Sequence, residues 1–281
     1  MVNLKRALGA LPSTLPRRIS LAAGAAALAL MVSPTPTSAV VGGRDADVGE
    51  FPWTTAIEAD GKQVCGATVI SGHTLLTAAQ CVDGRTASSL SIRYGTVDRE
   101  TGGQVVKAAE LIPHESYDAG SLDYDIAVIR TTADLVRGNG VQPVCLPAAE
   151  QKLTGAGRVS GWGATREGGE SADRLQAADL PLMSDDEATA AYEGYREITG
   201  RMIGAGLPSG GRGPAERDEG SPLVVLDDNN NATLAGLYSW ARGSARPGSP
   251  AIFTSAPALT GWIKQQIAAD PAPTACGKST R

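Results

Sequence analysis

The sequence predicts an all-β fold of short strands joined by tight turns. The chain of 281 residues contains 34 glycines and 2 phenylalanines, a composition that suits a turn-rich β protein better than a helical bundle. Runs rich in β-branched residues alternate with Gly, Asp and Ser turns, and no repeat of fixed period is visible. This pattern is typical of a barrel or a sandwich, with strands expected at 64–70, 74–77, 90–94, 105–112 and 126–130.

One helix is expected near the C-terminus. Apolar side chains recur at helical spacing over about 257–268, from Pro257 onward, and Ser255 or Thr254 can cap the first turn. The Pro-rich residues 269–281 are expected to form a loose tail, except where Cys276 ties them down.

Residues 1–39 have the three parts of an export signal: a basic region, an apolar run over 19–32, and a small-residue end at 37–39. The apolar run is too short to span a bilayer comfortably, although an uncleaved N-terminal anchor remains the alternative. The mature chain is therefore expected to begin near Val40 and to be secreted. The pair Arg17 and Arg18 leaves general and twin-arginine export both open.

The charge and the cysteines exclude several classes of partner. Loss of the signal removes four basic residues and no acidic ones, which changes the formal charge from −5 to about −9. So acidic a surface argues against nucleic acid or an anionic membrane as partner. Four cysteines in an exported chain favour two disulfides, because no Cys/His cluster has metal-binding spacing. Neither a metal nor another cofactor is expected.

Eight short motifs carry a resemblance to a known family. They occur in order at 40–43, 49–53, 65–66, 76–81, 125–127, 161–163, 218–224 and 239–240. Together they resemble the trypsin/chymotrypsin family of serine proteases. The resemblance implies two packed six-stranded antiparallel β-barrels, over about 40–145 and 146–255, with a substrate cleft between them and a C-terminal helix.

Two of the three catalytic positions implied by this resemblance are substituted. Gln80 stands where the family has its histidine base, and a carboxamide has no useful basicity near neutral pH. Glu219 stands where the family has its nucleophilic serine, and its charge opposes formation of an oxyanion. Asp125 retains the aspartate position, with a predicted structural role that includes hydrogen bonds from Gln80. We therefore expect a proteolytically inactive homologue.

The positions around the nucleophile are partly kept and partly altered. Arg217 replaces the glycine of the oxyanion hole, so its side chain either obstructs the substrate carbonyl or pairs with Glu219. Val40 and Asp218 match the family's activation pair, in which a freed N-terminal amine enters the core and meets a buried carboxylate.

The specificity pocket implied by the resemblance is altered as well. Gly213 stands at its floor, where trypsin-like enzymes carry an aspartate, and Ala241 and Ala251 stand at wall positions that are usually glycine. A small-residue or blocked pocket is expected, without preference for Lys or Arg.

The resemblance also assigns the disulfides. It implies Cys65–Cys81, which braces the loop that carries Gln80, and Cys145–Cys276, which ties the segment between the barrels to the tail. Two further family disulfides are missing as whole pairs, at Ala188 with Gly204 and at Ala215 with Ser244.

A rescue of catalysis would need another histidine and another serine. His73 and His114 both fall in loops and are expected at the surface, and Ser221 is expected to pack rather than react. The leading hypothesis is a secreted homologue that binds a protein or peptide in the former substrate cleft without cutting it. The alternatives are a hydrolase with an unrecognised arrangement, such as Glu219 with Asp125 as an acid pair, and a folded relic without selected function.

Overall fold

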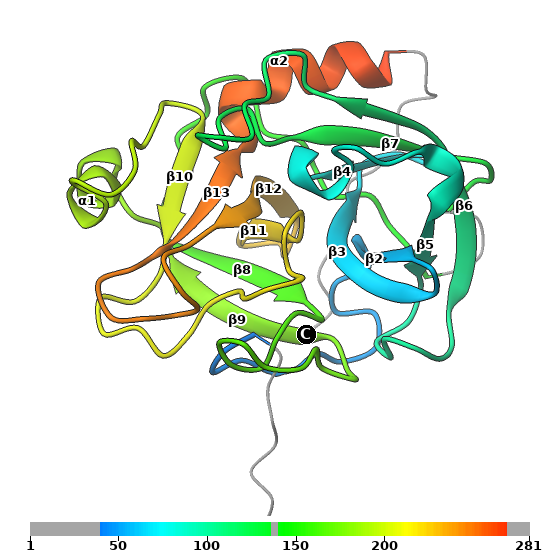
Figure 1. The fold of residues 1–281 in the computed structure, drawn as a ribbon, viewed down its shortest axis with the longest axis horizontal. Coiled ribbons are helices and arrows are strands. Elements are labelled where there is room, and N and C mark those ends of the chain that lie inside the picture. The colour runs from blue at the N-terminus through cyan, green and yellow to red at the C-terminus, as the bar shows by residue number, and fades with distance from the viewer. Residues whose placement is uncertain (1–39, 136–139, 269–281) are drawn as a thin grey trace, which may run out of the picture. The chain divides into compact units, whose positions relative to one another are not determined.

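A computed structural model describes residues 40–135 and 140–268 of the chain (Figure 1). The expected signal peptide over 1–39 and the expected tail over 269–281 lie outside the described residues. Within the described part, no helix is long and apolar enough to cross a membrane.

Six of the first seven strands close into an antiparallel barrel, which confirms that part of the predicted fold. The strands follow one another around the barrel as β2, β3, β4, β7, β6 and β5. Their inward side chains, including Ile57, Leu75 and Ile129, form a core of their own. The bounds are Thr54–Ala59 (β2), Lys62–Val69 (β3), Thr74–Thr77 (β4), Leu90–Tyr94 (β5), Gln104–Pro113 (β6) and Ala127–Thr131 (β7).

The remaining strands form a seven-stranded antiparallel sheet in the order β1, β9, β8, β11, β12, β13 and β10. An isolated bridge between Leu182 and Ala205 joins the end of β9 to β10, so six strands curl round on themselves and β1 is added at the edge. The bounds are Arg44–Asp45 (β1), Ala156–Gly161 (β8), Gln176–Pro181 (β9), Met202–Ala205 (β10), Pro222–Leu226 (β11), Ala232–Trp240 (β12) and Ala251–Ser255 (β13).

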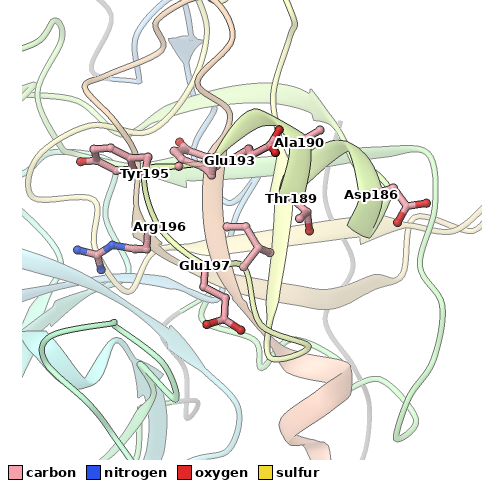
Figure 2. A pocket seen from close by; sticks show the side chains of 10 residues that line it. Asp186, Thr189, Ala190, Glu193, Tyr195, Arg196 and Glu197 are labelled. Atoms are coloured by element: carbon pink, nitrogen blue, oxygen red, sulfur yellow. The ribbon is translucent and has the colours of Figure 1, made fainter.

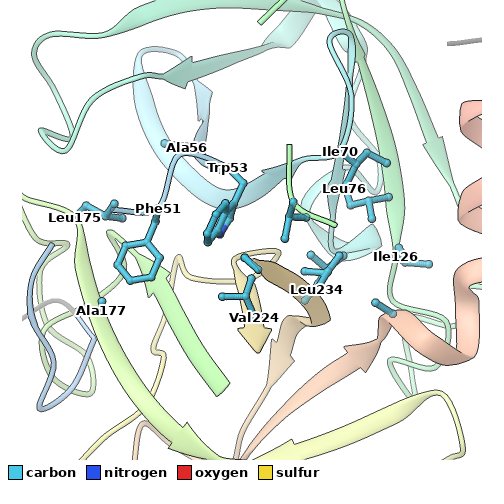
Figure 3. Close-up of a cluster of buried hydrophobic side chains, with 14 of the residues drawn as sticks. Phe51, Trp53, Ala56, Ile70, Leu76, Ile126, Leu175, Ala177, Val224 and Leu234 are labelled. Carbon is cyan, nitrogen blue, oxygen red and sulfur yellow. The ribbon is translucent and has the colours of Figure 1, made fainter. Parts of the chain in front are cut away.

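A shared hydrophobic core joins the two barrels. Trp53 is fully buried between them, and Figure 3 shows its indole above Val224 of β11 and close to Phe51. The hydroxyl groups of Thr54 and Ser160 make a hydrogen bond of 2.7 Å across the same boundary. Because buried aromatic side chains contribute much of the energy of a core, this contact fixes the barrels, and hence any site at their boundary, in one arrangement.

The segment between the barrels is tied to both of them. The Val144 N–H donates to the Val69 carbonyl at 3.0 Å, and the Cys145 N–H donates to the Ala232 carbonyl at 3.0 Å. Cys145 is disulfide-bonded, and its expected partner, Cys276, lies outside the described residues.

The C-terminal helix α2 (Ala256–Ile267) returns from the second barrel to the first (Figure 1). Ser255 caps it, because its hydroxyl accepts a hydrogen bond from the Ala258 N–H at 3.3 Å. Ile263 is buried in the shared core. Arg130 of β7 donates to the Gln266 carbonyl at 2.6 Å, which satisfies a carbonyl of the last turn and holds the helix on the first barrel.

A second, short helix was not expected from the sequence. Helix α1 spans Asp185–Ala191 and begins with a capping box between Ser184 and Glu187. Ala188 of this helix lies beside Gly204 of strand β10: a Cβ on Gly204 would lie 2.9 Å from the Cβ of Ala188. The two positions that the resemblance pairs are therefore neighbours in space.

Candidate functional site at the barrel boundary

Gln80 is positioned by a short turn and a disulfide. It lies in the 3-10 turn Ala79–Cys81, which follows β4. The Cys65–Cys81 disulfide ties this turn to β3. Gln80 is thereby held at the edge of the first barrel that faces the second.

Asp125 is fully buried and its carboxyl group is surrounded by donors from both barrels. Its Oδ1 accepts the Gln80 backbone N–H at 2.9 Å, and its Oδ2 accepts the Gln80 side-chain amide at 2.6 Å and the Ser239 hydroxyl at 2.5 Å. Burial raises the pKa of Asp125, and the hydrogen bonds from Ser239 and Gln80 oppose that rise.

The Gln80 amide links the barrels through one of its two contacts, because Asp125 belongs to the first barrel and Ser239 to the second. Besides donating to Asp125, its Nε2 donates to the backbone carbonyl of Ser239 on β12 at 2.9 Å. Both amide hydrogens are therefore used as donors to second-barrel or buried acceptors. This arrangement holds the two barrels together and offers no atom that can take up a proton.

The Glu219 carboxylate folds back onto the turn that carries it. Its Oε2 accepts the backbone N–H of Arg217 at 2.8 Å, and the N–H of Glu219 itself also stabilises the charge. These are the two N–H groups that the family resemblance assigns to the oxyanion hole. A carboxyl group of the chain therefore uses donors to which a reaction oxyanion would bind.

Arg217 keeps the glycine-like backbone of that turn without its side chain pairing with Glu219. Its φ is 72°, a value that non-glycine residues rarely adopt. Gln63 donates from Nε2 to the Arg217 carbonyl at 3.1 Å, and the guanidinium donates to the Ser171 hydroxyl at 3.1 Å. Anchors on both sides hold the strained residue in place.

Asp218 is completely buried next to glycines that leave room for it. A Cβ on Gly163 would lie 2.3 Å from the Asp218 carboxyl carbon. The carboxylate accepts the N–H groups of Gly163 at 2.7 Å and Ala215 at 3.1 Å. Val40 is also fully buried, in the core of the second barrel.

Two buried carboxyl groups, those of Asp125 and Asp218, and the half-buried carboxyl group of Glu219 thus lie around the boundary, each with a raised pKa. Burial is the largest cause for each of them and raises the pKa of Asp218 to about 8 and that of Glu219 to about 7, while Asp125 is also raised. They do not form a metal site: within the described residues, no group of three His, Cys, Asp or Glu side chains is arranged to hold a metal ion.

Two of the three residues expected in the specificity pocket line a very small cavity. Gly213 and Ala251 line one cavity of about 10 Å³, which is roughly the space of one water molecule. A Cβ on Gly213 would lie 3.6 Å from the Ala245 methyl. Ala241 does not line this cavity and packs, half-buried, against the core of the second barrel. The cavity has no room for a substrate side chain.

The expectation that His114 lies at the surface is wrong. Only 7% of its surface is exposed, because its ring lies between Tyr124 at 4.5 Å and Trp262 at 4.9 Å. Burial lowers the pKa of His114 and favours its neutral form. Its Nδ1 accepts the Ser116 N–H at 3.1 Å, so His114 is a packed residue of the first barrel.

Ser221 and His73 do not replace the missing catalytic groups. Ser221 is fully buried, and a Cβ on Gly66 would lie 2.1 Å from its Oγ. This hydroxyl has no hydrogen-bond partner among the described residues. His73 is half-buried in the turn before β4, and its Nδ1 lies 3.4 Å from the Thr131 carbonyl. Ser221 is therefore a packed residue, and His73 is part of the first barrel.

Some contacts of the site were not predicted from the sequence. Ser239 lies in a motif that carries the resemblance, yet its hydrogen bond to Asp125 was not anticipated. Gln63 lies two residues before the motif at Cys65, and its hydrogen bond to Arg217 was not anticipated either. For both residues, the only signal in the sequence was their position in or near a family motif. For Arg196, which lies over the Trp240 ring, no signal existed, because a loop far away in sequence brings it there.

The raised pKa of Glu219 gives a prediction about stability and pH. Because folding raises this pKa from 4.5 to about 7, the protonated side chain favours the folded state, and this contribution is lost as the pH rises across that window. Glu219→Gln stays neutral and keeps an acceptor oxygen. We expect it to melt close to the unchanged protein near about pH 5 and to be about 1–2 kcal/mol more stable near about pH 8.

Thermal melts over this pH range provide the measurement. Glu193→Gln, which removes an exposed carboxylate, is the control and should leave the pH dependence unchanged. If the stability difference between Glu219→Gln and the unchanged protein is the same at every pH, this carboxyl group is not the one that titrates.

Comparisons with known proteins agree with this fold. A family model described as Trypsin matches residues 40–263. The chain is 37% identical over 235 residues to Trypsin-1 of Astacus astacus, across 80% of this chain and 98% of that protein. It is 33% identical over 241 residues to Transmembrane protease serine 9 of Rattus norvegicus, across 84% of this chain but 22% of that longer protein. The chain therefore belongs to the trypsin family of serine proteases.

Proposed function

We propose that this chain is an exported member of the trypsin family that has no peptidase activity and binds a protein or peptide in the former substrate cleft. The observation that carries the proposal is the hydrogen bond between the Glu219 carboxylate and the Arg217 N–H. A side chain of the protein thereby uses a donor that acyl transfer requires.

The loss of the base supports the same conclusion. In serine proteases a neutral imidazole takes the proton from the serine hydroxyl. Here the Gln80 amide donates to Asp125 and to the Ser239 carbonyl, and an amide nitrogen has no accessible lone pair for a proton. Neither the nucleophile nor the base of the family mechanism is therefore present.

No specific observation favours a hydrolase that uses Glu219 and Asp125 as an acid pair. Such a pair needs one carboxyl group free to exchange a proton with substrate. Asp125 is fully buried and holds Gln80 and Ser239. The binding role is supported instead by an intact two-barrel frame around the cleft, and export by the signal-like residues 1–39 ahead of Val40.

The first prediction from this proposed function concerns catalysis. The purified protein should neither cleave peptide or ester substrates nor react with a fluorophosphonate serine probe, because loss of nucleophile or base costs about 10⁶-fold in turnover. Combining Gln80→His, Glu219→Ser and Arg217→Gly should restore weak hydrolysis of a small ester, whereas Glu219→Ser alone should not.

Active-site titration and burst kinetics provide the readout. Stoichiometric labelling of any serine in the unchanged protein would sink the assignment of inactivity. Activity in the Glu219→Ser single variant would show that a base other than position 80 is in use.

The second prediction concerns binding. Peptides selected from a random library on the purified protein should bind at the cleft wall beside Ala241. Ala241→Trp should then weaken them about tenfold or more, because a bulky side chain excludes the peptide backbone. Val48→Trp, at a residue 79% exposed elsewhere, is the matched control. Failure to select any peptide, or an equal loss of peptide affinity in both variants, would contradict a cleft-binding role.

The third prediction concerns maturation. If processing exposes the amine of Val40, that amine can pair with the buried Asp218 carboxylate, whose raised pKa reflects burial next to Glu219 and Glu216. N-terminal sequencing should give Val40. Asp218→Ala should lower the free energy of unfolding by about 3–5 kcal/mol, because it leaves the buried amine without its partner. One residue added before Val40 should have a similar effect, because it leaves the Asp218 carboxylate without the amine. Unchanged melting temperatures in both variants would refute the pair.

A further inference from the structure

Two arginines rest on a cluster of aromatic rings beside the cleft. The guanidinium carbon of Arg196 lies 4.9 Å from the centre of the Trp240 ring, and that of Arg242 lies 5.5 Å from Tyr195 and 5.9 Å from Tyr192. The rings contact one another, with centroid distances of 4.7 Å for Tyr192 and Trp240 and 6.5 Å for Tyr195 and Trp240. We call these five residues the arginine–aromatic cluster.

The cluster lies where the second barrel borders the cleft. Trp240 is the last residue of β12 and follows Ser239, whose carbonyl holds the Gln80 amide. Arg242 comes two residues later and is exposed. Tyr195 and Arg196 belong to the loop after α1, which also lines a hollow of about 800 Å³ (Figure 2). A peptide that leaves the cleft along the end of β12 would meet both arginines.

Neither arginine has a carboxylate partner within the described residues. The Arg196 guanidinium donates to the Ser121 carbonyl at 3.0 Å, and that of Arg242 donates to the Ser249 hydroxyl at 3.3 Å. Elsewhere arginines such as Arg93 pair with acidic side chains. The chain has 30 acidic and 25 basic residues, so acidic groups are not scarce.

Several acidic side chains of the second barrel make no ion pair with these arginines within the part of the chain that the structure describes. Glu193 and Glu197 lie on the same loop, and Figure 2 shows the Glu197 side chain pointing away from Arg196. Glu216 is exposed and accepts a hydrogen bond from the Ser244 hydroxyl at 3.4 Å. The guanidinium of Arg242 is therefore exposed and that of Arg196 half-exposed, and the carboxylates on the loop of Arg196 would repel an acidic segment that is not in contact with the arginines.

The chemistry of a stacked guanidinium indicates what would bind. A guanidinium that lies over a ring keeps its in-plane N–H groups for hydrogen bonds, and each arginine uses one of them on Ser121 or Ser249. The remaining N–H groups can donate to a carboxylate. Stacking also limits the rotamers of the arginine, so less entropy is lost when a ligand binds. Tyr192 and Trp240 are buried beneath the arginines, whereas the ring of Tyr195 adds apolar contact area. The exposed fraction of Tyr195 is 54%, so part of this area is open to a partner.

We propose that the arginine–aromatic cluster binds an acidic, partly apolar peptide segment of the partner, with its carboxylates on Arg196 and Arg242. This inference rests on the proposed cleft-binding function and specifies the chemistry of its ligand. It explains why an acidic chain keeps two unpaired arginines at the border of the cleft, on a platform of aromatic rings.

Binding to a fluorescein-labelled peptide in which glutamate alternates with leucine and tyrosine tests the proposal, with fluorescence anisotropy as the readout. A second peptide with every glutamate replaced by glutamine is its neutral counterpart. The glutamate peptide should bind more tightly, and added salt should weaken it selectively. Arg196→Gln combined with Arg242→Gln should weaken it about tenfold or more and leave the glutamine peptide unchanged.

Lys107→Gln combined with Lys264→Gln removes the same charge from exposed sites on β6 and α2, and should change binding less than about twofold. Equal effects of the two double variants would overturn the proposal, because net charge alone would explain them. So would a phosphoserine peptide that binds when the glutamate peptide does not, since the cluster would then recognise phosphate.

The outcomes also separate this inference from the function on which it rests. If both peptides bind equally and Ala241→Trp abolishes both, the cleft binds peptides and the acidic preference is wrong. If neither peptide binds and the random library yields none, the cleft-binding function itself fails. Thermal melts of all variants, which should agree with the unchanged protein, exclude loss of folding as the cause.

Discussion

The arrangement of the site depends on the need to satisfy one buried carboxyl group. Asp125 has no exposed surface, and a carboxylate in that position is tolerated only if donors surround it. The donors come from both barrels: Gln80 from the first and Ser239 from the second. The side-chain amide of Gln80 meets this need in part, because its N–H donates to Asp125. The fold therefore keeps its inter-barrel connection although Gln80 stands where the family has its histidine.

Much of the fold could be predicted because strand patterning is local. The strand at Leu90–Tyr94 has the predicted bounds, and the terminal helix agrees within one residue at each end. Helix α1 was missed although Ser184 and Glu187 form a capping box, since seven residues with one buried side chain give no apolar period. Closure of the second barrel depends on the isolated bridge from Leu182, which no local pattern encodes.

The positions of the site were predictable from motifs, whereas most of its contacts were not. Gln80 and Glu219 could be aligned to the family, but the return of the Glu219 carboxylate to the Arg217 N–H depends on a turn with φ of 72°. His114 was misjudged for a related reason. It lies in a loop, as expected, yet Trp262 from the terminal helix covers it, and that contact spans more than half of the chain.

The features that support the proposed inactivity and those that support the proposed binding lie in different parts of the boundary between the barrels. The missing base, the occupied oxyanion hole and the cavity of about 10 Å³ at Gly213 all lie at its inner end. The proposed loss of peptidase activity rests on the first two features, whereas the small cavity bears on which side chains a substrate could present. The outer border at Arg242 is not altered by any of these changes, because its guanidinium rests on Tyr192 and Tyr195 rather than on catalytic groups. Substitutions of the catalytic positions at the inner end therefore need not disturb the proposed recognition surface at the border.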